Sequence, residues 1–262
     1  MAGSVVFDPA DADGVATVTL SNPGKRNAID IAMWQALREG FERLQHLTPE
    51  AAPRVVLLRG AEGQFASGGD IVEFAQFRFD ETRLRDFHEG IVAPALQALL
   101  DCDIPMLAQI EGACIGGGLE IAACCDIRVC AAGSRFGAPI AKLGFPMAPG
   151  ELQLLVRVAG APLLRRMLLE AQLFDADEAL ALGLVHAVCA EADLAAQASQ
   201  RARRMAALSP QAARINKRTL RQIASGGPGA EERHAHYAYA DSAQHREGIA
   251  AFIAKRTPRF DG

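Results

Sequence analysis

A run of three glycines followed by a glutamate is the part of this sequence best suited to chemistry. Gly116, Gly117 and Gly118 come after a short apolar stretch, and Glu120 stands three residues beyond Gly117. The pattern predicts a buried strand, a glycine turn and then a helix. Amides in a first helical turn lack intrahelical partners and lie at the positive end of the helix dipole, so they can stabilise an oxygen that becomes negative. Glu120 returns to the same face one turn later, where a carboxylate can move protons.

The same residues also allow a purely structural interpretation. Glycines often serve only to let two backbone segments pack closely, and a glutamate in a first helical turn often caps the helix. A second glycine-rich stretch, at 60–71, repeats the pattern of strand, loop and helix earlier in the chain. From these residues alone, both the structural and the functional interpretation stay open.

Predicted strands and helices alternate through most of the chain, with glycine turns between them, and this order indicates an α/β fold. From residue 151 onward helices dominate, and the clearest linker is Ser-Gly-Gly-Pro-Gly at 225–229. We therefore divide the chain into a core at 1–200 and a C-terminal helical region at 201–262. Strands are expected at 15–20, 55–58, 105–110, 127–129 and 183–188, and helices at 31–47, 152–158, 163–169, 176–182, 193–207, 211–223 and 230–254.

Composition narrows the class of protein. The chain has 262 residues, which suits one large domain or one domain with an appendage, and half of them are apolar, which is enough for a sizeable core. Its net charge of −4 argues against a nucleic-acid partner. The N-terminus lacks the basic and apolar regions of a signal peptide, and no apolar stretch approaches membrane-spanning length without a charge. We expect a cytoplasmic protein without a membrane partner.

The six cysteines and six histidines do not suggest a metal site. No two cysteines form a C-x-x-C pair, and four lie in the apolar middle of the chain, where cysteine behaves as a small hydrophobe. His234 and His236 would face different ways on a helix, and His88-Glu89 lacks the second histidine of a metalloprotease motif. We expect reduced thiols and no metal.

Three loops in a fixed order resemble those of the crotonase superfamily, the enoyl-CoA hydratase/isomerase family. The loop at 21–28 (SNPGKRNA) is similar to the family's first CoA loop, and 65–71 (FASGGDI) is similar to its first oxyanion loop. The loop at 111–120 (EGACIGGGLE) is similar to the second oxyanion loop and is followed by the family's Cys-Asp-Ile at 125–127. The match covers almost the whole chain, from about residue 15 to 260. It implies a spiral of ββα units with a C-terminal helical trimerisation region.

The resemblance also implies a site. The backbone amides of Ser67 and Gly117 would form an oxyanion hole for the thioester carbonyl of an acyl-CoA, with Glu120 as the matched acid/base. Coenzyme A would enter as part of the substrate, so no further cofactor is implied. The family forms trimers or pairs of trimers, and its C-terminal residues often reach CoA across a subunit boundary. The residues implied in substrate or CoA binding are Lys25, Ala28, Ala66, Gly68, Gly69, Asp70, Ile71, Ile140, Phe252 and Lys255.

One position departs from the pattern of the family's hydratases, which use two glutamates. The second should follow Phe-Gly-Ala-Pro at 136–139, where this chain has Ile140. Isoleucine cannot transfer a proton, and acid–base catalysis is typically worth about 10²–10⁴-fold, so efficient hydration is not expected. An acid that related members place further along this loop falls on Ala148. The sequence leaves open whether Glu151, which also suits a helix N-terminus, or His88 takes part.

We therefore predict an enzyme of the enoyl-CoA hydratase type, in fatty acid metabolism, that acts on an acyl-CoA thioester through an enolate. A second hypothesis keeps the enolate but changes the reaction to double-bond isomerisation, decarboxylation or thioester hydrolysis. A third hypothesis is an acyl-CoA-binding protein without catalysis. The sequence does not define the acyl chain, nor does it decide between a trimer and a hexamer.

Overall fold

The computed structural model describes residues 2–260 of the chain. Six strands form one sheet in the order β1-β2-β3-β4-β6-β8, in which β1 and β2 are antiparallel and the other neighbours are parallel. Two short parallel strands, β5 and β7, form a second sheet. The strands are β1 (Ser4–Asp8), β2 (Val15–Ser21), β3 (Val55–Gly60), β4 (Met106–Ile110), β5 (Ala113–Ile115), β6 (Ile127–Ala131), β7 (Arg135–Gly137) and β8 (Ala187–Cys189).

Helices connect these strands and continue beyond the sheet. A π-helical turn at Asp86–Val92 joins α3 to α4, and 3₁₀ turns lie at Ile140–Leu143, Glu191–Asp193 and His236–Asp241. The α-helices are α1 (Ile31–Gln45), α2 (Ile71–Phe74), α3 (Glu81–Arg85), α4 (Ala93–Asp101), α5 (Gly117–Cys124), α6 (Pro149–Ala159), α7 (Ala161–Leu169), α8 (Ala176–Ala181), α9 (Leu194–Ala206), α10 (Pro210–Ala224), α11 (Ala230–Ala235) and α12 (Ala243–Ile253).

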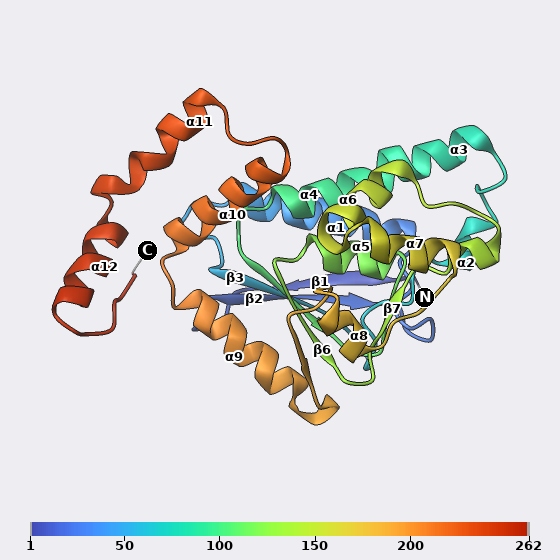
Figure 1. Ribbon diagram of the computed structural model, residues 1–262, viewed down its shortest axis with the longest axis horizontal. Helices are drawn as coiled ribbons and strands as arrows, with labels where there is room; N and C mark the ends of the chain where they lie inside the picture. Colours follow the sequence, from blue (N-terminus) through green and yellow to red (C-terminus); the bar gives the residue numbers. More distant parts are fainter. Residues whose placement is uncertain (1, 261–262) are drawn as a thin grey trace.

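Both faces of the large sheet are covered, as a parallel sheet requires. Figure 1 shows α1, α4 and α5 on one side of the strands and α9 on the other. The side chains of β3 alternate accordingly: Val56 and Leu58 belong to the main core, whereas Val55 and Leu57 pack with the buried face of α9. This explains why the sequence of β3 is a continuous apolar run rather than an alternating one.

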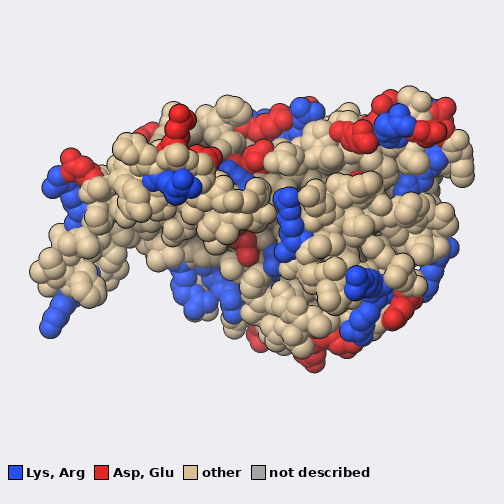
Figure 2. Space-filling model, turned by 45° about the horizontal axis from the view of Figure 1, so that its top comes forward, with Lys and Arg blue, Asp and Glu red and all other residues tan. Residues whose placement is uncertain are grey.

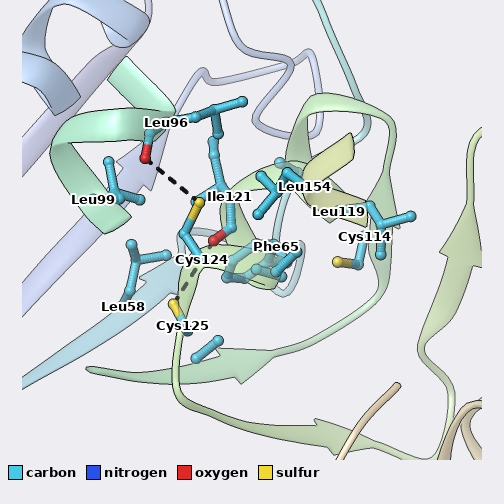
Figure 3. Close-up of a cluster of buried hydrophobic side chains, with 14 of the residues drawn as sticks. Leu58, Phe65, Leu96, Leu99, Cys114, Leu119, Ile121, Cys124, Cys125 and Leu154 are labelled. Carbon is cyan, nitrogen blue, oxygen red and sulfur yellow. Dashed lines mark hydrogen bonds between the residues drawn. The ribbon is translucent and has the colours of Figure 1, made fainter. Parts of the chain in front are cut away.

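Helix α5 is almost completely buried, which fixes the position of the glutamate that it carries. Leu119 lies beside Leu154 and Cys114, and Ile121 points toward Leu96 of α4 (Figure 3). The thiol of Cys124 contacts the carbonyl of Leu96 at 3.8 Å, and burial raises the pKa of this thiol well above its usual range. The thiols around α5 therefore act as small core hydrophobes.

The predicted α/β class is confirmed, and each expected strand overlaps an observed one. Strands β1, β5 and β7 were not predicted, since β5 and β7 are only three residues long and lie within glycine-rich loops. The prediction of a single helix at 230–254 is wrong. The 3₁₀ turn at 236–241 separates α11 from α12, and the Ser242 side chain caps α12 by accepting from the His245 amide at 3.2 Å.

The predicted boundary between residues 200 and 201 falls inside α9. Ala198, Ala202 and Ala206 of this helix are buried against the sheet, so α9 belongs to the sheet layer over its whole length. The helices that extend away from the sheet begin with α10 (Figure 1). The C-terminal helical region therefore starts a few residues later than expected.

A buried aspartate anchors α10 to the core. Asp103 is 4% exposed and accepts hydrogen bonds from Arg218 Nε and Arg221 Nη2, both at 2.9 Å. Lys217, also on α10, donates to the Ile104 carbonyl at 2.8 Å. Burial alone would raise the pKa of Asp103, but the hydrogen bonds and charges of the two arginines together lower it.

Replacing Asp103 with Asn should therefore destabilise the protein by about 2 kcal/mol at pH 7, because hydrogen bonds to a charged group are lost from a buried site. The lowered pKa means that this contribution is present above the unfolded-state pKa and is lost as pH falls through the folded-state value. Urea unfolding at several pH values measures it. The exposed Asp101→Asn variant is the control, and equal stability of the two variants at pH 7 would contradict the anchor.

Candidate active site

Backbone hydrogen bonds join the loops 22–30, 66–70 and 113–116 side by side. Ile29 donates to the Gly68 carbonyl at 2.8 Å, and Asp70 donates back to the Ile29 carbonyl at 2.9 Å. On the other side of loop 66–70, the Ala66 amide donates to the Ala113 carbonyl at 2.8 Å, and the Ile115 amide donates to the Ala66 carbonyl at 3.0 Å. The two glycine-rich loops are thereby held in one fixed register.

The side chain of Asn27 holds the first of these loops against the second. Its amide nitrogen donates to the carbonyls of Ala61 at 2.8 Å and Gln64 at 2.7 Å. Its amide oxygen accepts from the Asn22 backbone at 3.0 Å. Asn27 is in the left-handed region at φ 55°, a conformation that asparagine tolerates better than most residues.

Glycine is required where the two loops meet. Gly116 has φ 48°, and a Cβ on it would lie 3.6 Å from the Cα of Gly68. A Cβ on Gly118 would lie 2.6 Å from the Ala66 carbonyl oxygen, which is closer than a real Cβ contact allows. The triple glycine therefore lets the start of α5 approach the preceding loop directly.

The hydrogen bonds of this ladder decide which amides are available to a ligand. The Ser67 amide donates to the Arg26 carbonyl at 3.0 Å, so the predicted role of Ser67 as an oxyanion donor is wrong. The hydroxyl of Ser67 is also used locally, donating to the Lys25 carbonyl at 3.0 Å. Within residues 2–260, no protein group accepts from the amides of Gly69 and Gly117. These two amides are free at the junction of the loops.

A cavity of about 330 Å³ opens at this junction. Its lining includes Gly68, Gly69 and Ile71 from the first glycine loop and α2, and Gly116 and Gly117 from the second. Glu120 also lines it, together with aromatic side chains of α2, of the turn 86–92 and of the segment after Ile140, namely Phe74, Phe87 and Phe145. The cavity therefore combines two amides without a partner among residues 2–260, the carboxyl group of Glu120 and walls that are largely apolar.

The carboxyl group of Glu120 sits in a buried environment that favours its neutral form. Glu120 is 6% exposed, and burial followed by the negative charge of Glu151 raises its pKa well above the usual value. No protein group among residues 2–260 donates a hydrogen bond to it. A carboxyl group that is buried, free of partners and next to unpaired amides is suited to proton transfer.

The residues predicted to bind CoA are only partly brought to this cavity. Lys25 forms an ion pair with Asp70 at 2.6 Å, and Asp70 also caps α2 by accepting from the Val72 amide at 3.1 Å. Ala28 and Ala66 are buried, and the Ala66 amide and carbonyl both take part in the ladder described above. Asp70 thus fixes its loop, and Lys25 lies at the rim of the loop with 42% of its side chain exposed.

Phe252 and Lys255 lie far from the cavity within one chain. Figure 1 shows α12 at the opposite end of the molecule from α2. Phe252 is 84% exposed. Three other apolar or aromatic side chains of the C-terminal segment 230–253 are also exposed, namely Tyr237, Ile249 and Ile253. Figure 2 shows that much of the visible surface of this segment is uncharged. A role for Phe252 in CoA binding requires a second subunit.

Ile140 lines the cavity as expected, and it is accompanied by an acid that the sequence left undecided. Glu151, in the first turn of α6, is 4% exposed and accepts from or donates to His88 Nδ1 at 2.7 Å. Both side chains line the same cavity as Glu120. The two residues lie 63 positions apart, so no local sequence pattern could have predicted that they pair. The one sequence signal was the presence of an acid close to the loop that carries Ile140.

Residues 2–260 contain no group of three or more His, Cys, Asp or Glu side chains arranged to hold a metal ion. None of their helices combines the length and the apolar character that a bilayer crossing demands.

Comparison with known proteins agrees with this geometry. Residues 10–262 match the family described as enoyl-CoA hydratase/isomerase. The chain is 33% identical to a 2,3-dehydroadipyl-CoA hydratase of Escherichia coli over 95% of both chains. It is 31% identical to a short-chain-enoyl-CoA hydratase of Clostridium acetobutylicum, covering 79% of this chain and 77% of the relative.

Solved structures show the same fold. A crystal structure of an enoyl-CoA hydratase/carnithine racemase from Magnetospirillum magneticum superposes with a TM-score of 0.90 and 38% identity, over 98% of this chain and 94% of that one. Pseudomonas aeruginosa AtuE gives a TM-score of 0.88 at 30% identity, over 98% and 99%. Fold and comparisons define an α/β enzyme of the enoyl-CoA hydratase type. The chain belongs to the enoyl-CoA hydratase/isomerase family and acts on acyl-CoA.

The raised pKa of Glu120 should be visible in protein stability. Its folded-state pKa lies above the unfolded value, so the stability it contributes is present below the unfolded pKa and is lost as pH rises through the folded pKa. A Glu120→Gln variant has no group that titrates at this position and does not lose this stability. Its free energy of unfolding at pH 8 should be about 1 kcal/mol or more above that of the wild type, since a tenfold change in proton affinity corresponds to about 1.4 kcal/mol.

Urea unfolding of both proteins at pH 5 and pH 8 provides the measurement. The stability difference between the variant and the wild type should be smaller at pH 5 than at pH 8. An identical pH dependence in the two proteins would show that Glu120 does not have a raised pKa.

Proposed function

We propose that the amides of Gly69 and Gly117 bind the thioester oxygen of an acyl-CoA and that Glu120 transfers the proton at Cα. The observation that carries this proposal is that no group among residues 2–260 accepts a hydrogen bond from these two amides, which lie on adjacent loops and line the same cavity as a buried carboxyl group. Removing the Cα proton gives an enolate, whose negative charge develops on the oxygen between the two amides. A donor of this kind is typically worth about 3 kcal/mol of transition-state stabilisation.

The position of Glu120 supports its role. Gly117 is the first residue of α5 and Glu120 is three residues further on, so both project from the same turn. An oxygen bound at Gly117 therefore brings the neighbouring carbon toward Glu120. The raised pKa of Glu120 makes its ionised form a stronger base than an ordinary carboxylate.

We extend the proposal to the rest of the substrate and to the assembly. Lys25, exposed at the rim of its loop, would bind the phosphates of CoA, either after its ion pair with Asp70 breaks or while it contacts both groups. The exposed apolar residues of α12 would pack on another subunit, in a homotrimer or a pair of trimers, and bring Phe252 and Lys255 to its CoA. Six free cysteines, five of them buried, suit a reducing compartment such as the cytoplasm.

The reaction itself need not be efficient hydration. Several relatives bear hydratase names, but Ile140 stands where a proton-transferring residue would be needed beside the enolate. The alternatives that share the enolate are double-bond isomerisation, decarboxylation and thioester hydrolysis. A protein that binds acyl-CoA without turnover is the alternative outside catalysis.

The direct test is exchange of the Cα proton of hexanoyl-CoA with D₂O, followed by mass spectrometry. The wild type should catalyse exchange, and Glu120→Gln should reduce the rate by about 10²–10⁴-fold, because the proton acceptor is lost. Glu39→Gln, an exposed glutamate of α1, is the matched control and should exchange normally. Hydration of crotonyl-CoA should be slow in the same preparation.

Calorimetry with hexanoyl-CoA separates the alternatives. Binding without exchange would support the non-catalytic protein and overturn the proposal. Exchange that survives in Glu120→Gln would remove this residue from the mechanism, and rapid hydration of crotonyl-CoA would show that Ile140 is no obstacle.

A further inference from the structure

A hydrogen-bonded pair, His88 and Glu151, lines the cavity without a role in the steps described so far. Glu151 is 4% exposed, and His88 Nδ1 lies 2.7 Å from its Oε1. The two side chains come from the first turn of α6 and from the π-helical turn 86–92. Burying a carboxyl group is costly unless it is hydrogen-bonded, and here the partner is a single imidazole on the cavity wall.

Aromatic side chains surround this pair in the wall of the cavity. His88 follows Phe87, whose ring packs against Phe74 and Phe77 with centroids 5.9 and 4.6 Å apart. Phe145 extends the same aromatic wall, 6.3 Å from Phe74. An acyl chain that lay along this aromatic wall would pass Glu151, whereas Glu120 shares its helical turn with Gly117.

We propose that Glu151, held in place by His88, is a second proton-transfer residue, and that it works with Glu120 to move the double bond of a β,γ-unsaturated acyl-CoA. This inference rests on the proposed function, because the enolate must form first. Glu151 would be a catalytic residue and His88 a positioning residue. Glu151 would supply the proton to Cγ, a transfer that the side chain of Ile140 cannot make.

The step balances without a co-reactant. The Glu120 carboxylate takes the proton from Cα, and the electrons of that C–H bond pass into a dienolate whose oxygen is held by the amides. Protonated Glu151 then gives its proton to Cγ, the dienolate electrons return to form the Cα–Cβ double bond, and Glu151 is left as a carboxylate. Proton exchange between the two acids, directly or through solvent, restores the starting state.

The electrostatics of the pair fit one shared proton. The charge of Glu151 raises the pKa of Glu120, so two negative charges are disfavoured in this cavity. The imidazole of His88 can accept from protonated Glu151 or donate to its carboxylate, depending on the tautomer. Two cationic side chains, Arg78 and Lys142, also line the cavity, and the guanidinium of Arg78 lies 3.6 Å from the centroid of the Phe145 ring.

The experiment compares two rates in the full-length protein: isomerisation of 3-hexenoyl-CoA to 2-hexenoyl-CoA, and Cα exchange of hexanoyl-CoA in D₂O. In Glu151→Gln, the ratio of isomerisation to exchange should fall by about 10²-fold or more, because only the second proton transfer is lost. Glu120→Gln should lower both rates. Glu89→Gln, on the same turn as His88 but exposed, should change neither.

His88 is tested by a pair of variants. His88→Ala should lower the isomerisation rate, and His88→Asn should recover part of it, because its amide nitrogen can stand in for Nδ1. A loss of structure would not be rescued in this way. An equal loss in both variants would overturn the positioning role.

The outcomes separate the two proposals. Exchange without isomerisation in the wild type, or an unchanged ratio in Glu151→Gln, would overturn the role of Glu151 and leave the enolate mechanism intact. A wild type that neither exchanges nor isomerises would overturn the enolate mechanism itself.

Discussion

The structure depends on a backbone ladder that crosses three loops. Carbonyl and amide groups of Ile29, Gly68, Ala66 and Ile115 are paired between neighbouring loops, so the loops behave as an extension of the sheet. A strand pairs only some of its amides with each neighbour. The ladder thus uses the Ser67 amide and leaves the Gly69 amide free, beside the unpaired amides that begin α5. The proposed oxyanion site therefore consists of amides that this hydrogen-bonding pattern does not use.

Much of this arrangement could be predicted from the sequence. The apolar runs gave the strands of the parallel sheet, and the glycine motifs identified the loops and Glu120. The choice between Ser67 and Gly69 could not be made, because both lie in one motif and only the partners of each amide distinguish them. The signal that could have helped is the glycine itself, since a close approach by a ligand suits Gly69 better than Ser67.

Tertiary pairing explains the other differences. Glu151 and His88 lie on elements far apart in the chain, and no local pattern joins them. The boundary near residue 200 was misplaced because Ala-rich α9 resembles the helices that follow it, although its small side chains pack on the sheet. The proposed role of Glu151 rests on this tertiary pairing and on its place in the same cavity as Ile140.

The most direct measurement is a crystal structure with a bound, non-reactive acyl-CoA analogue. The account predicts that the thioester oxygen lies about 2.7–3.1 Å from the amide nitrogens of both Gly69 and Gly117, with Glu120 facing Cα. It also predicts that the Ser67 amide keeps its bond to Arg26. A thioester oxygen bound elsewhere, or one held by the Ser67 amide after that bond has broken, would contradict the account.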